Sequence, residues 1–263
     1  SAWLKRHYPA AFTAAILNSQ PMGFYAPAQL ISDARQHGVQ VMPVDVNHSE
    51  WDCTLEPLQD SHARQTLDHD HTPIDHGNST APTLAAAQPA SVEDFSLRLG
   101  LRMISGLQTV HAEAILHARR DGTFTSVADL TRRTRLGQSV ISQLSAADVF
   151  KSLNQDRRTA LWQALAQEQK PIHQPLFDVL DAGDDEISSL PPLTPEQQVV
   201  EDYRTVGLSL KAHPLSFHRC LLDRLKITPT SHLKNKSNNR HLRVAGMVIL
   251  RQRPSTAKGI TFV

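Results

Sequence analysis

The chain has 263 residues, 40% of them hydrophobic and 20% charged, and its 27 Lys and Arg against 26 Asp and Glu leave a formal net charge of +1. These values are typical of a soluble globular protein of one to three domains, because no apolar run reaches the roughly 18 residues that span a bilayer and no basic-then-apolar start marks a secretory signal. The two cysteines, Cys53 and Cys220, exclude a disulfide framework and a four-cysteine zinc site, and they fit a reducing, cytoplasmic compartment.

Helical patterns fill most of the N-terminal 58 residues. Apolar residues recur close to a 3.6-residue period, and Pro9 suits the start of a helix. Gly38 suits the C-terminal cap of another. The predicted elements are helices over 2–17, interrupted at Tyr8-Pro9, and over 28–36, a loop over 18–27 and a short strand over 39–42.

Residues 59–94 differ in composition from the rest, because Ser, Thr, Pro, Ala, His and Asp dominate and large apolar residues are few. Such a segment buries too little apolar surface to offset the entropy lost on ordering, so we expect a flexible insertion. The run Asp68-His69-Asp70-His71 with Asp75-His76 has metal-ligand residue types. It lacks an apolar shell to fix their geometry, so we expect adventitious nickel or zinc binding and no functional metal site.

Regular structure is predicted again from Phe95. Ser126 with Asp129 forms a weak capping arrangement, and Thr194-Pro195 is a strong helix start. The predicted helices cover 109–120, 126–135, 139–144, 155–169, 194–206 and 214–225, with an acidic, proline-rich linker over 171–194. The period then switches to two, which predicts strands over 241–250 and 259–263. A chain that opens in a helix without Met and stops inside a strand is expected to be an excerpt of a longer protein.

Charge is segregated along the chain. Residues 1–95 carry a net charge of −7 and residues 96–170 one of +5, while residues 171–202 hold eight acidic and no basic residues. Residues 203–263 hold twelve basic residues against the single acid Asp223. This pattern predicts an anionic partner for the basic parts and a solvated linker for the acidic one. The near-neutral total therefore does not argue against nucleic acid.

The segment from Met103 to Leu116, MISGLQTVHAEAIL, has the pattern of a helix-hairpin-helix. Gly106 would let the backbone turn tightly and approach a phosphate, to which the following helix would offer free N–H groups and the positive end of its dipole. Such a contact reads no bases, so binding would be sequence-independent and salt-sensitive. A helix–helix corner without DNA contact is the alternative, because Gln108 and Val110 stand where a second glycine and a lysine are usual.

A more degenerate second hairpin is predicted over 141–150, with Ala146 in place of the expected glycine. Its spacing supports it, since helix-hairpin-helix units normally occur in pairs. The residues expected to contact DNA are Ser105, Gly106, Leu107, Gln108, Thr109, Arg119, Arg120, Ser145, Ala146, Arg157 and Arg158.

No pattern supports catalysis by this chain. Cys53, beside Trp51 and Asp52, is expected to be a buried, inert thiol. The G-x-S-x-G, Walker-type and G-x-G-x-x-G motifs are absent. Polymerase chemistry requires clustered Asp residues on strands to hold two metals, and no apolar strand pattern here carries a D-x-D pair.

Several motifs occur in order along nearly the whole chain apart from residues 59–92. They are QPMGFY at 20–25, DARQHGV at 33–39, PVDVN at 43–47, WDCTLE at 51–56, RLGLRMISGLQTVHAEAIL at 98–116 and TVGLSLKAHPL at 205–215. In these motifs the chain resembles the bacterial C-family DNA polymerases, the alpha subunits of polymerase III, and most of all the error-prone branch of that family.

The resemblance implies a mainly α, multi-domain fold. The implied domains are the C-terminal part of the fingers domain at 1–58, a flexible insertion at 59–94, a tandem helix-hairpin-helix module on duplex DNA at 95–170, an acidic linker at 171–194, a helical connector at 195–238 and the first strands of an OB-fold at 239–263. OB-folds bind single strands on a basic, aromatic-bearing face. The family's catalytic palm, which uses Mg²⁺ and dNTPs, would lie outside this chain, so no cofactor and no independent polymerase activity are expected here.

Replicative members of the family carry a clamp-binding peptide, Gln-x-x-Met/Leu-Phe, after the hairpins. The matching place here reads His173-Gln174-Pro175-Leu176-Phe177, so Gln174, Leu176 and Phe177 are the candidate partner-binding residues. His173 replaces the leading Gln. This departure favours recruitment through an accessory, Y-family-like mutasome protein over direct binding of the sliding clamp.

The first hypothesis is therefore that this chain is part of an error-prone DNA-directed DNA polymerase acting in damage-induced mutagenesis and translesion synthesis. This segment would bind primer–template duplex without base specificity and route the single-stranded template. The alternative is a non-catalytic module that recruits mutasome or clamp partners. A third possibility is a piece with no independent function.

Overall fold

A computed structural model describes residues 2–21, 25–58, 95–166, 191–248, 251–253 and 261. The chain forms two compact units, Ser1–Leu193 with Glu201–Leu210 and Thr194–Val200 with Lys211–Val263. The described residues are mainly helical with a small mixed sheet, which confirms the predicted mainly α, multi-domain class. Across these ranges, no helix is both long and apolar enough to cross a bilayer.

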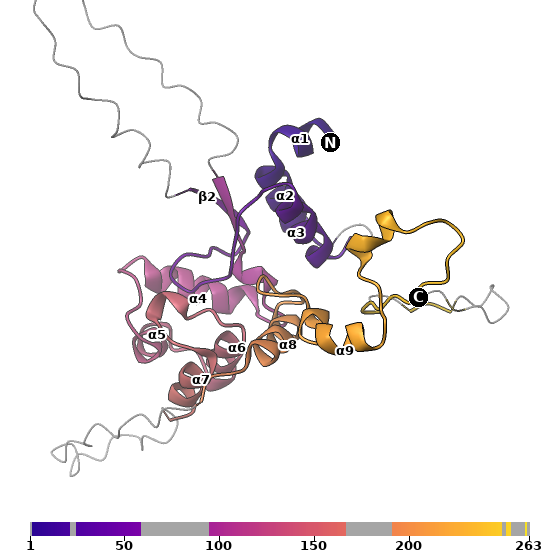
Figure 1. The fold of residues 1–263 in the computed structure, drawn as a ribbon. Coiled ribbons are helices and arrows are strands. Elements are labelled where there is room, and N and C mark those ends of the chain that lie inside the picture. Colours follow the sequence, from indigo (N-terminus) through magenta and orange to yellow (C-terminus); the bar gives the residue numbers. More distant parts are fainter. Residues whose placement is uncertain are drawn as a thin grey trace, which may run out of the picture. The chain divides into compact units, whose positions relative to one another are not determined.

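The N-terminal helices begin and end where the breakers predict. Tyr8-Pro9 separates α1 (Ala2–His7) from α2 (Pro9–Asn18), and proline in a first turn costs no helical hydrogen bond. The next helix, α3 (Pro27–Gln36), ends before Gly38, whose φ of +85° suits glycine. The buried faces of α2 and α3 join the hydrophobic core, and Figure 1 shows the two helices side by side near the sheet.

A mixed sheet joins segments that lie on either side of residues 59–94. Its central strand β3 (Phe95–Arg98) runs parallel to β1 (Val41–Met42) and antiparallel to β2 (Thr54–Pro57). Leu97 of β3 lies between Val41 and Leu55 and is 0% exposed. The start of the predicted hairpin module therefore shares a sheet with the N-terminal segment, and the division into fingers and hairpin modules stays a prediction.

Two contacts fix the chain where it leaves β3. The Arg98 guanidinium donates to both carboxylate oxygens of Glu56 at 2.8 Å and to the Pro43 carbonyl at 2.9 Å, which satisfies a side chain that is only 8% exposed. Gly100 then passes so close to the neighbouring backbone that a Cβ would lie 2.4 Å from the carbonyl carbon of Asp52. Only glycine fits at that position.

A polar loop, residues 45–49, ties the sheet region to the helices that follow it. Asn47 donates through Nδ2 to the Phe124 carbonyl at 3.0 Å and accepts from the Phe124 N–H at 2.8 Å. Asp45 accepts from the Ser152 N–H at 3.0 Å. The loop thus provides hydrogen-bond partners for backbone groups of two later segments that would otherwise need water.

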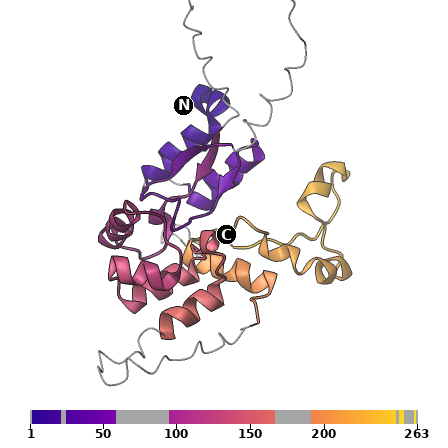
Figure 2. The same ribbon diagram turned by 90° about the vertical axis from the view of Figure 1, so that its left-hand side faces the viewer.

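Four helices form the body of the hairpin region, and Figures 1 and 2 show them gathered in one group. They are α4 (Thr109–Arg119), α5 (Val127–Thr134), α6 (Gln138–Ala146) and α7 (Arg157–Ala166). Short 3-10 turns, η2 (Leu101–Met103) and η3 (Lys151–Leu153), lie ahead of α4 and α7. Ile115, Leu130 and Leu144 are fully buried between these elements. All four predicted helices are confirmed within one or two residues at their described ends.

The predicted capping at Thr194 is also confirmed. Thr194 Oγ1 accepts from the Gln197 N–H at 3.3 Å, and Gln197 Oε1 accepts from the Thr194 N–H at 3.1 Å, so the pair forms a capping box. The helix that follows is α8 (Pro195–Thr205). The remaining elements are η5 (Pro214–Ser216), α9 (Arg219–Arg224) and η6 (Thr230–Asn235), so the helix predicted over 214–225 is split into a 3-10 turn and a short α-helix.

The strand predicted over 241–250 is not formed in its described part, residues 241–248. These residues have no regular secondary structure, and all except the half-buried Ala245 are exposed. An alternating pattern becomes a strand only where one face is buried and a neighbouring strand completes the backbone hydrogen bonds. The Thr228 N–H donates to the Arg243 carbonyl at 2.8 Å, but the described residues form no ladder there. The second predicted strand, 259–263, lies outside the described residues apart from Thr261.

Candidate nucleic-acid interface

The first hairpin presents a short loop between η2 and α4. Ser105, Gly106, Gln108 and Thr109 are exposed, whereas Leu107 is 7% exposed and joins the core. Gly106 has a φ of +77°, a left-handed conformation that costs an L side chain roughly 1–2 kcal/mol. The loop therefore turns sharply on Gly106, with Leu107 buried beneath it.

The N-terminus of α4 is open to an anion. Its N-cap residue Gln108 makes no side-chain capping bond, and its first turn holds no acidic residue. Within the described part of the chain, the N–H groups of Gly106, Thr109 and Val110 have no acceptor. Unpaired N–H groups at the positive end of a helix dipole bind phosphate oxygens. This end of α4 has the geometry that a phosphate contact requires.

Two hydrogen bonds hold the loop from behind. Gln143 of α6 donates through Nε2 to the Ser105 carbonyl, and a Cβ on Gly106 would lie 3.2 Å from that nitrogen. The Ser105 N–H donates to the Thr205 carbonyl at 2.8 Å. Both backbone groups of Ser105 are thus engaged, which fixes the direction of the N–H groups that follow. Sequence reasoning missed Gln143, because its bond joins residues 38 positions apart.

The loop between α6 and α7 holds two left-handed residues, Asp148 with a φ of +61° and Asn154 with a φ of +55°. Ala146, which stands in place of the expected glycine, is the last residue of α6 and lies two positions before Asp148. Asn154 lies two residues before Asp156, which precedes α7, as Gly106 lies two residues before Gln108, which precedes α4. Relative to the helix that follows, Asn154 therefore occupies the position of Gly106. Asn is the residue after Gly that best tolerates this conformation, so an Asn shortly before a helix start was the available signal.

Besides Leu107, two further predicted contact residues are buried. Ser145 is 0% exposed, and its hydroxyl donates to the Ile141 carbonyl at 2.8 Å. The Arg157 side chain is 6% exposed and forms an ion pair with Asp202, whose second carboxylate oxygen accepts from Ser209 Oγ at 2.6 Å. Because breaking a buried ion pair leaves an uncompensated charge, Arg157 is placed for internal structure and not for DNA.

The N-terminus of α7 is occupied by a side chain. Asp156 Oδ1 accepts from the N–H groups of Arg158 at 2.8 Å and Thr159 at 2.9 Å, and Oδ2 accepts from Thr159 Oγ1 at 3.0 Å. The Arg158 guanidinium donates to the Pro191 carbonyl at 2.8 Å. The helix end that would meet a phosphate in the second hairpin already holds a carboxylate.

The two arginines at the end of α4 differ in role. The Arg119 side chain is 14% exposed, donates to the Ser49 carbonyl at 2.7 Å and pairs with Glu50. Arg120 is exposed, and it forms no ion pair within the described ranges. Of this predicted pair, Arg120 alone is placed to meet a phosphate.

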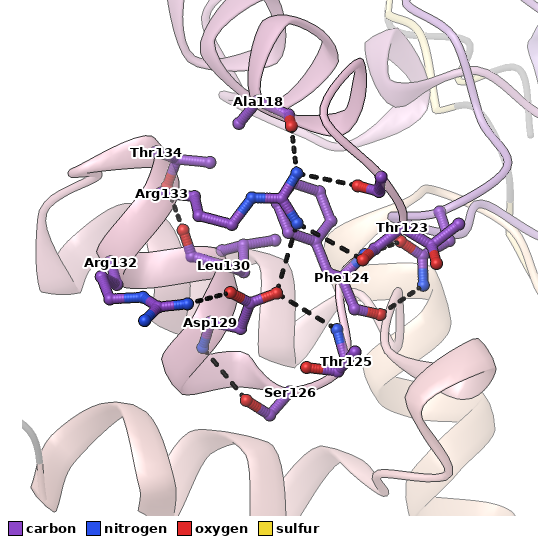
Figure 3. A network of polar contacts seen from close by, with 12 residues as sticks. Ala118, Thr123, Phe124, Thr125, Ser126, Asp129, Leu130, Arg132, Arg133 and Thr134 are labelled. Atoms are coloured by element: carbon purple, nitrogen blue, oxygen red, sulfur yellow. Dashed lines mark hydrogen bonds and ion pairs between the residues drawn. The ribbon is translucent and has the colours of Figure 1, made fainter.

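Arg133 joins the end of α4 to α5, as Figure 3 shows. Its guanidinium donates to the Ala118 carbonyl and, at 2.8 Å, to the Gly122 carbonyl. The same group lies 4.6 Å from the ring centroid of Phe124, in cation–π geometry. Arg133 therefore supplies hydrogen bonds to backbone carbonyls at and just after the end of α4, and its guanidinium is not available to contact DNA.

Asp129 is the acidic centre of this network (Figure 3). It accepts from Arg132 at 2.8 Å and from Arg133 at 3.3 Å, and its N–H donates to Ser126 Oγ at 3.0 Å, which confirms the predicted cap. The hydrogen bond from Arg132 is the main cause that lowers the pKa of Asp129 below its ordinary value, and it outweighs the opposing effect of burial. The Asp129 carboxylate is therefore held in its ionised form.

The prediction of a buried thiol at Cys53 is confirmed. Cys53 is 4% exposed and its sulfur accepts from the Gly100 N–H at 3.4 Å. Burial raises the pKa of this thiol above its ordinary value, so the neutral form is favoured. The candidate partner-binding residues Gln174, Leu176 and Phe177, and the run from Asp68 to His76, lie outside the described residues.

Comparison with known proteins gives relatives for the whole chain. A family model described as a helix-hairpin-helix motif matches residues 38–160, which include the sheet and both hairpin turns. The chain is 46% identical to part of the error-prone DNA polymerase of Rhodopirellula baltica, 42% to part of error-prone DNA polymerase 1 of Rhizobium meliloti and 41% to part of the error-prone DNA polymerase of Methylococcus capsulatus. All of this chain is aligned in each case, but it spans only 20% to 23% of the length of these relatives.

Proposed function

We propose that this chain, which is homologous along its whole length to a segment of the error-prone DNA polymerases, is the part of such a polymerase that holds primer–template DNA. The observation that carries the proposal is the open N-terminus of α4 beside the exposed Gly106 turn, within a match to the helix-hairpin-helix family model. Backbone N–H groups contact phosphates and read no bases. Binding is therefore independent of sequence.

For the whole protein we propose error-prone DNA synthesis, the activity named for its relatives, in the service of damage-induced translesion synthesis. Nucleotidyl transfer uses two metal ions held by clustered carboxylates, so the complete enzyme requires Mg²⁺ and dNTPs in a palm domain. In that reaction, this chain holds the primer–template DNA. The exposed basic residues of the C-terminal part support contact with the single-stranded template.

Titration of the whole chain against short fluorescent duplexes of two unrelated sequences tests the proposal by anisotropy. We expect affinities within about twofold of each other, and a plot of log K against log salt with a slope of about −0.9 for each phosphate contacted. No binding at low salt, or a strong preference for one sequence, would contradict the proposal.

The alternative function, recruitment of a sliding clamp or an accessory mutasome protein, depends on Leu176 and Phe177. A chain with Leu176→Ala and Phe177→Ala separates the two functions. We expect it to bind duplex as the parent chain does. A chain that captures purified clamp or accessory protein through these residues, but never binds duplex, would replace the DNA-binding function with the recruiting one.

A further inference from the structure

Both hairpins have a left-handed residue three positions before a helix, but they differ in charge at the helix end. In each, a 3-10 turn leads to a left-handed residue, Gly106 or Asn154, and then to a helix. The first helix follows the neutral Gln108 and its N-terminus is uncapped. The second follows Asp156, whose carboxylate accepts two helix N–H groups.

A carboxylate at a helix N-terminus prevents phosphate from binding there. It takes the N–H groups that phosphate oxygens would use, and its negative charge repels a second anion. A phosphate at α7 would have to displace Asp156 from Arg158 and Thr159 before making any bond of its own. The second hairpin is thus closed to the contact that the first hairpin is open to make.

The second hairpin instead holds another part of the chain. Arg157, the first residue of α7, pairs with Asp202 of α8 and lies 4.0 Å from Asp148 in the loop after α6. Asp202 also accepts from Ser209 Oγ at 2.6 Å. Arg157, which the sequence analysis predicted to contact DNA, therefore holds residues 201–205 of α8 against the hairpin.

Those residues lead back to the first hairpin. Thr205 lies three positions after Asp202, and its carbonyl accepts the Ser105 N–H at 2.8 Å. Gln143 of α6 holds the carbonyl of the same Ser105. The loop that exposes the free N–H groups of α4 is thus braced on one side by α6 and on the other by the segment that Arg157 fastens.

We infer that the second hairpin makes no phosphate contact, and that it serves as an internal anchor which, through residues 201–205, positions the DNA-binding turn of the first hairpin. The inference rests on the proposed function, since it assigns the phosphate contact to the first hairpin. Arg157 and Asp202 are positioning residues in this scheme, and they act on DNA only through Thr205 and Ser105.

A pair of mirror substitutions in the whole chain tests the assignment with a short fluorescent duplex. Asp156→Asn keeps a capping oxygen but removes the charge, and we expect affinity and salt slope to stay within about twofold of the parent chain. Gln108→Asp gives the first hairpin the cap of the second, and we expect α4 to be stabilised while duplex affinity falls by about tenfold.

The outcomes separate the inference from the proposed function. A larger rise in affinity with a steeper salt slope for Asp156→Asn would show that DNA lies against the second hairpin, and would overturn the inference alone. Unchanged binding for Gln108→Asp would mean that the first hairpin is not the phosphate site, and the proposed function of that hairpin would fall with it.

The anchoring step is tested with Asp202→Asn, and Glu196→Gln, at an exposed position near the start of the same helix, is the control. We expect Asp202→Asn to reduce duplex affinity by about tenfold and to speed hydrogen exchange at the Ser105 and Gly106 amides, while Glu196→Gln changes neither. If Asp202→Asn fails to fold, Ser209→Ala removes the hydrogen bond from Ser209 Oγ to Asp202 and is expected to act in the same direction. Unchanged exchange and affinity in a folded Asp202 or Ser209 variant would overturn the anchoring role.

Discussion

Gly106 and Gly38 have nearly equal left-handed φ angles, +77° and +85°, but different surroundings. A Cβ on Gly106 would lie 3.2 Å from Gln143 Nε2, whereas one on Gly38 would have nothing within 4 Å. We predict that Gly106→Ala and Gly38→Ala each lower the free energy of unfolding by about 1 kcal/mol, because both strain the backbone equally. Gly106→Ala alone should weaken duplex binding, by about tenfold, because Gln143 must move away from Ser105.

Denaturant unfolding measures the first effect for both variants, and anisotropy titration measures the second. Equal loss of binding in the two variants would mean that general destabilisation is responsible. Equal retention of binding would mean that the conformation of the Gly106 turn does not matter to DNA.

Asp129 gives the stability of the α4–α5 junction a defined pH dependence. Its folded-state pKa is lowered, chiefly by the hydrogen bond from Arg132, so the folded protein favours the ionised carboxylate. A lowered pKa stabilises the fold above the unfolded value, near 3.9, and that stabilisation is lost as pH falls through the folded-state value. We predict that Asp129→Asn is less stable than the parent chain at pH 7, by about 1 kcal/mol or less, and that the difference shrinks below about pH 4.

Thermal unfolding across this pH range measures the difference. Asp121→Asn is the control, because Asp121 is an exposed carboxylate without an ion pair in the described structure. A deficit of Asp129→Asn that is constant from neutral to acid pH would assign the effect to lost packing instead of charge.

At the scale of elements, local chemistry predicts most helices and none of the non-local pairings. Thr194-Pro195 and Ser126 mark helix starts by capping, so their helices are readable from a few neighbouring residues. The partners of β3, by contrast, come from segments on the far side of residues 59–94, and no local pattern specifies them. The same limit explains why the strand predicted over 241–250 is not formed at 241–248, where an alternating pattern lacks a partner strand among the described residues.

The candidate site divides in the same way. The sequence motif correctly locates the Gly106 turn and the open end of α4, because both depend on neighbouring residues. The motif cannot show that Arg157 forms an ion pair with Asp202, or that Gln143 forms a hydrogen bond with Ser105, because these contacts join residues far apart in the sequence. A glycine-based pattern also misses the left-handed residues of the second loop, because these are Asp148 and Asn154.

The stability of the junction between sheet and helices depends on one side-chain amide, that of Asn47 in the loop over 45–49. Asn47 satisfies both backbone groups of Phe124, a residue that is 2% exposed. We predict that Asn47→Ala lowers the free energy of unfolding by about 2 kcal/mol, because two buried polar groups lose their partner. His48→Ala, an exposed neighbour in the same loop, should change it by less than about 0.5 kcal/mol. Denaturant midpoints measure both, and equal effects would show that the junction does not depend on the amide.

Across the whole molecule, the net charge of a segment overstates the positive charge that is free to contact DNA. Much of the positive charge in residues 96–170 is used internally, by the ion-paired arginines Arg98, Arg102, Arg119, Arg133 and Arg157. The second unit differs, because its Lys234, Lys236 and Arg240 are exposed and form no ion pair in the described ranges. Under the proposed function, the first unit would therefore contact DNA mainly through backbone N–H groups, and the second unit through its exposed cations.

This contrast predicts that single-stranded and duplex DNA depend on different residues. Replacing Lys234, Lys236 and Arg240 by Gln should weaken binding of a short single strand and flatten its salt slope by about 0.7 for each phosphate that is no longer neutralised, because released counterions set that slope. Duplex binding should change less, since the α4 contact remains. Gly106→Ala should show the reverse order of effects. Paired anisotropy titrations measure all four affinities, with Ser231→Ala plus Ser237→Ala as the uncharged control in the same region, and equal losses on both DNAs in both variants would mean that the two units do not divide the work.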